Sequence, residues 1–230
     1  MKITDIFFDL DRTLWDFDRN SHKTLMYIYQ EFNLNIKGVI DIDTFIASYT
    51  VHNEKLWALY RENRISKELL RSERFHLTLS DFGIDDNNLS VQLGDAYVSR
   101  CPLQTLLFPY SIEILEYLNK RYNLHIITNG FEEVQHIKLE ASGLTPFFLN
   151  IITSEKVDAK KPDPMIFEYA LKLAKVKAEN SIMIGDDLPV DIIGAKGVGI
   201  HQIYFNPNKK DHNEIIDYEV SSLIEIKEIL

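Results

Sequence analysis

The chain has 230 residues, of which 45% are hydrophobic and 26% are charged, and its formal net charge is −10. This composition is typical of a globular protein, and the length fits one domain with a large insertion or two small domains. The negative charge disfavours non-specific binding to nucleic-acid phosphates, although a local cationic site can still hold a small phosphorylated molecule.

The sequence carries few targeting or cross-linking signals. No apolar stretch approaches the ~18 residues that span a bilayer, and the first residues lack the pattern of a signal peptide. The single cysteine, Cys101, excludes an internal disulfide framework. We therefore expect a cytoplasmic protein that binds neither membranes nor nucleic acid, as a monomer or small homo-oligomer.

The first predicted element is a buried strand within residues 3–8, because its apolar residues run without alternation. Similar apolar runs follow at residues 124–129, 150–154, 181–187 and 199–205. Helical patterns lie among them at residues 111–121, 132–142, 164–174 and 190–196. This alternation predicts an α/β fold, a parallel sheet with helices on both faces.

Residues 16–104 show a different pattern. They contain helical patterns at residues 21–32, 43–61, 66–82 and 89–100 and no clear buried strand. We therefore predict a catalytic core made of residues 1–15 and 105–230, and a helical domain, residues 16–104, inserted after the first strand. We expect this insertion to act as a lid over the carboxyl ends of the strands.

Polar clusters fall at the ends of the predicted strands, where ligands bind in open α/β sheets. Asp9 and Asp11 follow the first strand, and Thr128-Asn129-Gly130 follows the second. Lys161 lies after the third strand. The fourth ends in Asp186 and Asp187, with Asp191 in the next helix. Each cluster alone has an ordinary explanation: Asp, Asn and Gly favour turns and helix N-caps, and most lysines are solvated.

Together, these side chains suit phosphoryl transfer. Carboxylates from several loops form an all-oxygen site that suits Mg²⁺, with Mn²⁺ as a substitute. Asp9 would attack phosphorus, and Asp11 would protonate the leaving oxygen and then deprotonate the hydrolytic water. Thr128, Asn129, Gly130 and Lys161 would hold the phosphate, assisted by the N-terminus of the following helix.

The order Asp-x-Asp-x-Thr, Ile-Thr-Asn, Lys-Pro and Gly-Asp-Asp-x-x-x-Asp resembles the haloacid dehalogenase superfamily of phosphohydrolases. The helical insertion resembles that superfamily's C1-type cap. Segments at residues 126–131, 153–155, 161–171 and 56–60 resemble its pyrimidine 5′-nucleotidase (YjjG-like) branch. The resemblance covers nearly the whole chain, and it implies a Rossmann-like core and Mg²⁺-dependent hydrolysis of nucleoside monophosphates.

The resemblance also implies residue roles. Asp9 matches the nucleophile and metal ligand, and Asp11 matches the acid/base, which also binds metal through its carbonyl oxygen. Asp186 matches a direct metal ligand, with Asp187 and Asp191 as supporting acids. Lys161 matches the lysine that screens nucleophile and phosphate.

Two positions refine this resemblance. Arg12 stands where the superfamily often has glycine, and we expect this arginine to point to solvent. The presence of Asp11 argues against carbon–halogen cleavage, because that reaction needs no proton donor for the leaving group.

Substrate choice is expected to lie in the inserted domain. Trp57, Tyr60 and Phe75 could stack on a base, and Phe17, Asn53, Arg71 and Arg74 could supply polar or packing contacts. The i, i+3 spacing of Trp57 and Tyr60 favours packing inside the helical domain instead.

The leading hypothesis is a 5′-nucleotidase whose partner is a pyrimidine nucleoside monophosphate. The alternatives are a phosphatase for a sugar phosphate or phosphoglycolate, and a non-catalytic phospho-acceptor or binding module.

Overall fold

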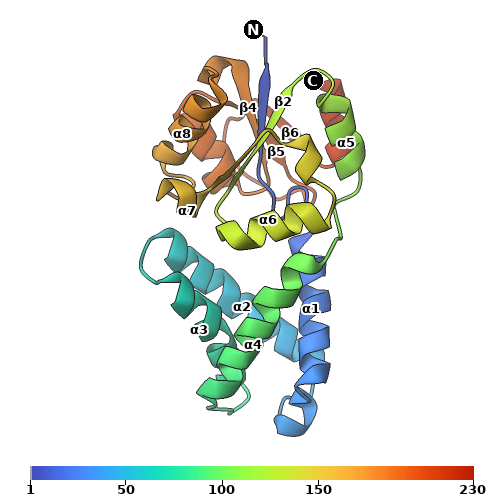
Figure 1. Cartoon of the computed structure of the whole chain (residues 1–230), viewed down its shortest axis with the longest axis vertical. Helices are drawn as coiled ribbons and strands as arrows, with labels where there is room; N and C mark the ends of the chain where they lie inside the picture. Colours follow the sequence, from blue (N-terminus) through green and yellow to red (C-terminus); the bar gives the residue numbers. More distant parts are fainter. Residues whose placement is uncertain (1) are drawn as a thin grey trace. The chain divides into compact units, whose positions relative to one another are not determined.

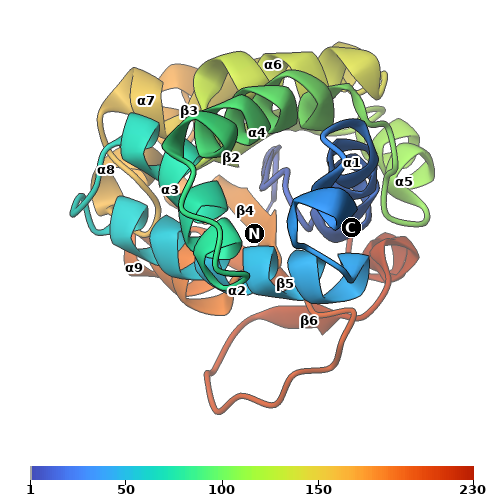
Figure 2. The same ribbon diagram turned by 90° about the horizontal axis from the view of Figure 1, so that it is seen from below.

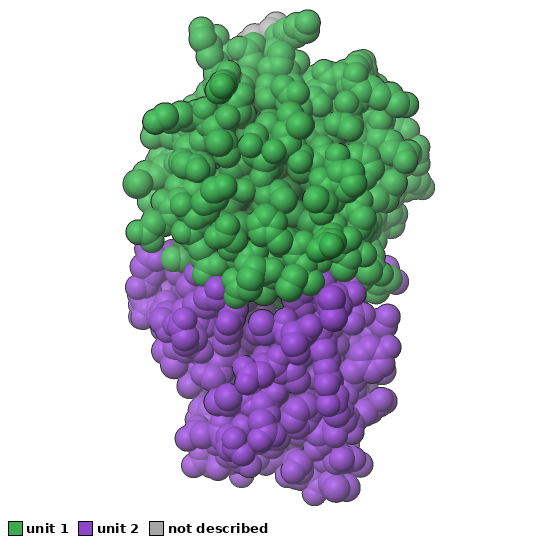
Figure 3. Space-filling view, viewed as in Figure 1, with its two compact units in different colours: residues 1–17, 105–230 green, residues 18–104 purple. Residues whose placement is uncertain are grey.

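The computed structural model describes residues 2–230, which form two compact units. One unit contains the chain up to Phe17 together with Thr105–Leu230, and the other contains Asp18–Gln104 (Figure 3). Within the described residues, each helix is too short or too polar to cross a bilayer.

The first unit is built on a six-stranded parallel sheet in the order β3-β2-β1-β4-β5-β6 (Figure 1). The strands are β1 (Asp5–Phe8), β2 (Asn123–Thr128), β3 (Asn150–Thr153), β4 (Ser181–Gly185), β5 (His201–Phe205) and β6 (Tyr218–Val220). The first five match the predicted strands. β1 lies between β2 and β4, with Phe8 opposite both Ile126 and Ile184. The segments that follow these three strands therefore begin side by side.

Helices cover both faces of this sheet, as predicted, with α7 and α8 on one side and α5 and α6 on the other (Figure 1). Their bounds are α5 (Ser111–Leu118), α6 (Glu132–Ala141), α7 (Ser154–Val157), α8 (Pro164–Ala174) and α9 (Gly194–Gly197). Successive strand residues point to opposite faces. Phe7, Ile127 and Met183 thus form one buried cluster with Ile166 and Phe167 of α8.

Three local features differ from the sequence prediction. β6 was not predicted; it has three residues and follows a long loop after β5 (Figure 2). The short helix α7 was not predicted either. The helix predicted at residues 190–196 is instead a π-helical turn, Leu188–Ile193, followed by α9.

The second unit is helical, as predicted. It comprises α1 (Phe17–Glu31), whose first residue belongs to the α/β unit, α2 (Ile42–Arg61), α3 (Lys67–Ser80) and α4 (Asn87–Arg100). Side chains of Asp41, Ser66 and Asp86 cap the starts of α2, α3 and α4. α3 packs against both α2 and α4. A Cβ at Gly94 would lie 2.9 Å from the carbonyl oxygen of Arg71, so glycine allows α3 and α4 to approach closely.

A short two-stranded ribbon marks where the chain leaves and re-enters the α/β unit. The backbone N–H of Asp16 donates to the carbonyl of Leu106 at 3.0 Å, and that of Phe108 donates to Leu14 at 2.9 Å. Trp15 and Leu107 form an antiparallel bridge between these two bonds. Backbone hydrogen bonds therefore join the two ends of the insertion inside the α/β unit.

Candidate active site

Asp9 lies directly beyond the end of β1. Its backbone N–H donates to the carbonyl of Ile184 at 2.9 Å, so the pairing with β4 continues up to this residue. Its side chain is buried, and Oδ1 lies 2.6 Å from Nζ of Lys161. Thr13 Oγ1 donates to Asp9 Oδ2 at 3.4 Å and lies 3.2 Å from Oδ1 of Asp186. Thr13 thus connects the ends of β1 and β4.

Lys161 is a buried ammonium group, contrary to the ordinary expectation of a solvated loop lysine. Its side chain is 2% exposed, and Nζ also lies 2.6 Å from Asp191 Oδ1. Burial alone would lower the pKa of Lys161, but the carboxylates of Asp191 and Asp9 outweigh it and raise that pKa above its ordinary value. Lys161 is therefore a permanent cation between two acids.

Asn129 holds the backbone of Lys161. Its Nδ2 donates to the Lys161 carbonyl at 2.9 Å, and its Oδ1 accepts from the Lys161 N–H at 2.8 Å. The sequence predicted that this side chain holds phosphate, whereas in the structure both ends of the amide contact the backbone of Lys161. Thr128 is buried, and its Oγ1 accepts from the N–H of Gly130 at 3.1 Å.

Asp9, Asp186 and Asp191 form a carboxylate cluster, with one oxygen from each within 4.8 Å of the others. Burial raises the pKa of Asp9 to about 7, and the positive charge of Lys161 only partly offsets this rise. Burial and the neighbouring acids also raise the pKa values of Asp186 and Asp191. Three carboxylates beside one ammonium would carry two excess negative charges if ionised. The cluster therefore fits a hard divalent cation.

A missing side chain makes room for this cluster. A Cβ at Gly185, the last residue of β4, would lie 2.4 Å from Asp191 Oδ2, so a larger residue would displace this carboxylate. Asp191 Oδ2 also accepts from the N–H of Asp187 at 3.2 Å.

Two predicted metal ligands have side chains that bond elsewhere. The Asp187 carboxylate accepts from the N–H of Val190 at 3.2 Å and caps the π-helical turn. The Asp11 carboxylate contacts Lys138 and Gln135 of α6, which the sequence analysis did not assign as functional. The signal that could have identified them is their i, i+3 spacing on the helix after Thr128-Asn129-Gly130, which places both on one face.

Arg12 does not simply point to solvent. Its guanidinium lies 4.9 Å from the ring centroid of Phe17, and its side chain is half-buried. Its backbone φ is 67°, in the left-handed region where glycine is usual. This backbone conformation explains why glycine is common at this position in the superfamily that the sequence resembles.

The predicted substrate residues of the helical unit make contacts within that unit. Trp57 is half-buried and packs edge-to-face on Tyr60 at 5.5 Å. Arg74 is 3% exposed, and its guanidinium lies 3.1 Å from Asn53 Oδ1 and over the rings of Tyr49, Phe75 and Tyr97.

Several known proteins are similar to this chain over nearly its whole length. The sequence-family model of the haloacid dehalogenase-like hydrolases matches residues 6–205 of this chain. The pyrimidine 5′-nucleotidase PynA of Streptococcus pneumoniae is 33% identical over 98% of this chain and 94% of its own. A glyceraldehyde 3-phosphate phosphatase of Methanothermobacter thermautotrophicus is 30% identical over 98% of both chains. The magnesium-bound crystal structure of the HAD-hydrolase YfnB from Bacillus subtilis superposes with a TM-score of 0.90, at 26% identity over 100% of this chain and 99% of that one.

Proposed function

The chain belongs to the haloacid dehalogenase-like hydrolases, and on this premise we propose that it is a Mg²⁺-dependent phosphomonoesterase acting through an aspartyl-phosphate, with pyrimidine nucleoside monophosphates as substrates. The observation that carries the proposal is the convergence of Asp9, Lys161, Asp186 and Asp191, which lie in the segments that follow β1, β3 and β4.

Asp9 is the proposed nucleophile. One of its carboxylate oxygens forms a bond to phosphorus while the bond from phosphorus to the ester oxygen breaks, and that oxygen takes a proton from the Asp11 carboxyl group. In the second step Asp11 takes a proton from water. The water oxygen then bonds to phosphorus, the bond to Asp9 breaks, and phosphate leaves.

The carboxylates of Asp9, Asp186 and Asp191, with the carbonyl oxygen of Asp11, would hold the metal ion, and Asp187 would support them. The ion would neutralise the acids and polarise the phosphate, which lets an anionic nucleophile approach an anionic substrate. Lys161 supplies a further positive charge beside Asp9, and Asn129 positions that lysine through its backbone.

The phosphate would contact Thr128, Lys161 and the backbone N–H groups around Asn129 and Gly130, next to the N-terminus of α6. Trp57 and Arg74 stay our predictions for substrate contacts in the helical unit, which we propose acts as the cap. Cytoplasmic location and assembly as a monomer or small oligomer also stay predictions.

The similarity to PynA supports a nucleotide substrate. A second candidate substrate is a small sugar phosphate, which the similar glyceraldehyde 3-phosphate phosphatase favours. A non-catalytic phospho-acceptor is disfavoured, because Asp11 supplies the acid/base group that repeated turnover needs.

The decisive experiment measures phosphate release from dUMP, UMP, dTMP, purine nucleotides, glyceraldehyde 3-phosphate and phosphoglycolate, with Mg²⁺ and with EDTA. Metal-dependent turnover strongest on pyrimidine nucleotides is the expected result. Strongest turnover on a sugar phosphate would keep the mechanism and replace the substrate. The absence of turnover on every ester would overturn the proposed function.

A further inference from the structure

Two side chains of α6 hold the Asp11 carboxylate. Lys138 Nζ lies 2.6 Å from Oδ1 and 2.8 Å from Oδ2, and Gln135 Nε2 donates to Oδ2 at 2.9 Å. The side chain of Lys138 is 5% exposed, whereas that of Asp11 is 26% exposed. The carboxylate thus receives three hydrogen bonds from buried donors and keeps one side open.

The loop after β1 fixes the ammonium group of Lys138. Nζ lies 4.4 Å from the Trp15 ring and 5.8 Å from the Phe17 ring. Trp15 is fully buried, and its backbone carbonyl accepts from the N–H of Arg12 at 2.9 Å. The loop that carries Asp11, together with the first residue of α1, therefore supplies the aromatic rings that hold Lys138 in place.

Gly130 gives Gln135 its access to Asp11. A Cβ at Gly130 would lie 1.4 Å from Gln135 Nε2 and 2.5 Å from its Cδ, so any larger residue would displace this amide. The backbone of Gly130 is not in the left-handed region, so the close approach of Gln135 is the reason for glycine here. Gln135 Oε1 is buried without a donor among the described residues, which leaves the Asp11 contact to orient the amide.

From this geometry we infer that Gln135 and Lys138 are positioning residues for proton transfer by Asp11. This inference rests on the proposed function. Asp11 must give a proton to the ester oxygen as that bond breaks, and it must take a proton from water as the bond between Asp9 and phosphorus breaks. Both transfers require the carboxyl group to stay in one place through the cycle, and α6 provides a rigid support for it.

The test compares two esters with different needs for a proton donor. A nucleoside 5′-monophosphate releases a strongly basic alkoxide and needs the acid, whereas p-nitrophenyl phosphate releases a stable phenolate and does not. We expect Lys138→Met to lower kcat for the nucleotide about 10²-fold, the size expected for a misplaced catalytic group, with KM changed less than about 3-fold.

With p-nitrophenyl phosphate, the same variant should release one equivalent of nitrophenol in a burst at near wild-type rate. A slow steady phase should follow, because water deprotonation still depends on Asp11. Gln135→Leu should show the same difference between the two esters with a smaller loss. Gly130→Ala should lower nucleotide turnover at least as much, since its Cβ would displace the Gln135 amide.

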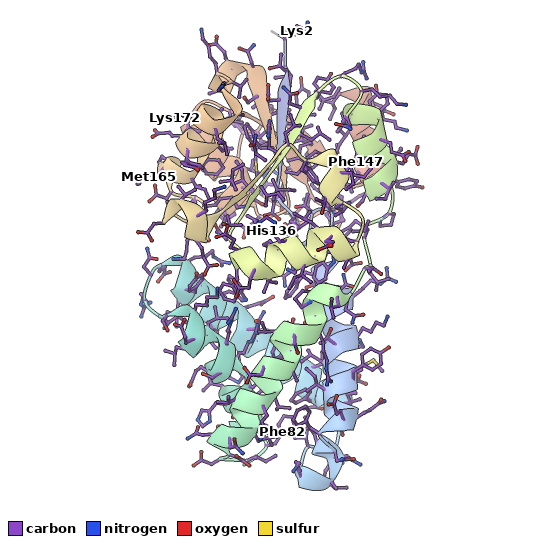
Figure 4. All side chains as sticks on the ribbon, viewed as in Figure 1. Lys2, Phe82, His136, Phe147, Met165 and Lys172 are labelled. Carbon is purple, nitrogen blue, oxygen red and sulfur yellow. The ribbon has the colours of Figure 1, made fainter. Side chains whose placement is uncertain are left out.

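The matched control is Lys172→Met, since Lys172 is exposed on the outer side of α8 (Figure 4). A merely structural role would lower the burst and the nucleotide turnover by the same factor, and this result in Lys138→Met and Gln135→Leu would overturn the inference. If Lys138→Met does not fold, as judged by circular dichroism, the two esters tested on Gln135→Leu decide the question. A wild-type protein that releases phosphate from neither ester would overturn the proposed function itself.

Discussion

The two units bury positive charge in different ways. In the α/β unit, Lys161 lies 2.6 Å from each of two buried carboxylates, Asp9 and Asp191. In the helical unit, the partners of the buried Arg74 are three aromatic rings and the amide oxygen of Asn53. Charges beside other charges respond to a metal ion or an anionic substrate, whereas a guanidinium among rings is fixed by packing. Lys161 should therefore respond to ligands of the α/β unit, whereas the contacts of Arg74 contribute to the stability of the helical unit.

The strongest test of this contrast is Asp9→Asn. It should reduce phosphate release at least ~10⁴-fold, because the nucleophile is lost. The same change should stabilise the metal-free protein, since burial raises the pKa of Asp9 to about 7 and a neutral amide avoids that cost. Phosphate assays and urea unfolding in EDTA check both effects, with the exposed Asp211→Asn as control. Near-normal release would contradict the nucleophile assignment.

The next largest effect is expected for Lys161→Met. Removal of one partner from a buried ion pair typically costs 3–5 kcal/mol, so we expect a loss of about 3 kcal/mol in the free energy of unfolding without metal. Phosphate turnover should also fall about 10²-fold or more. Urea unfolding measures the first effect. A loss below ~0.5 kcal/mol would mean that the buried acids do not depend on this ammonium.

Magnesium should stabilise the α/β unit. At a free concentration of about 100 times Kd, a bound ion contributes roughly 2.7 kcal/mol. Thermal unfolding with and without Mg²⁺ measures this stabilisation as a shift in Tm, and Asp186→Asn should reduce that shift. An equal shift in Asp186→Asn and in Asp211→Asn would remove Asp186 from the proposed ligands.

In the helical unit, Arg74→Met should cost about 2 kcal/mol of unfolding free energy. It removes the hydrogen bond to Asn53 and the contact with the Tyr97 ring at 4.5 Å, while methionine fills part of the space. This loss should not change when Mg²⁺ replaces EDTA, unlike that of Lys161→Met. The exposed Arg64→Met serves as control. If the loss in Arg74→Met depended on Mg²⁺, the two buried cations would not differ in their response to the metal ion, and the contrast would be wrong.

The smallest effect is a pH dependence from His125, which lies in β2 away from the carboxylate cluster. Its Nδ1 accepts from Asn150 Nδ2 at 2.9 Å, and its Nε2 lies 3.0 Å from Asp5 Oδ1, which suits a neutral ring. Burial lowers the pKa of His125, which Asp5 only partly offsets. The contribution of His125 to the free energy of unfolding is therefore complete above pH 6.5, the pKa of the unfolded state. This contribution declines as the pH falls below 6.5.

Between pH 7.5 and 5.5 this decline is at most about 1.4 kcal/mol. The difference in unfolding free energy between wild type and His125→Gln, measured at both pH values, isolates it. A difference that grows at the lower pH would contradict the sign.

The sequence was sufficient for the first five strands and for the edge of the sheet at which the polar clusters meet, because apolar runs mark parallel strands and their ends converge by topology. The sequence was not sufficient to predict which hydrogen bonds the polar side chains at this edge would form. Asp11 and Asp187 follow the same two strands as the clustered acids, yet the side chain of Asp11 contacts α6 and that of Asp187 caps a turn. Burial of Lys161 and the reason for Gly130 also depend on contacts between segments far apart in sequence.

The ribbon at Asp16 and Leu106 has a consequence for how such a protein can change over evolution. Backbone hydrogen bonds already join the two ends of the inserted segment. The length and sequence of this segment can therefore vary without changing how β1 pairs with β2. Lineages can therefore exchange one insertion for another while the strand ends, and the chemistry attached to them, stay constant. If the helical unit is the cap, as proposed above, recombination at these two positions would change substrate preference.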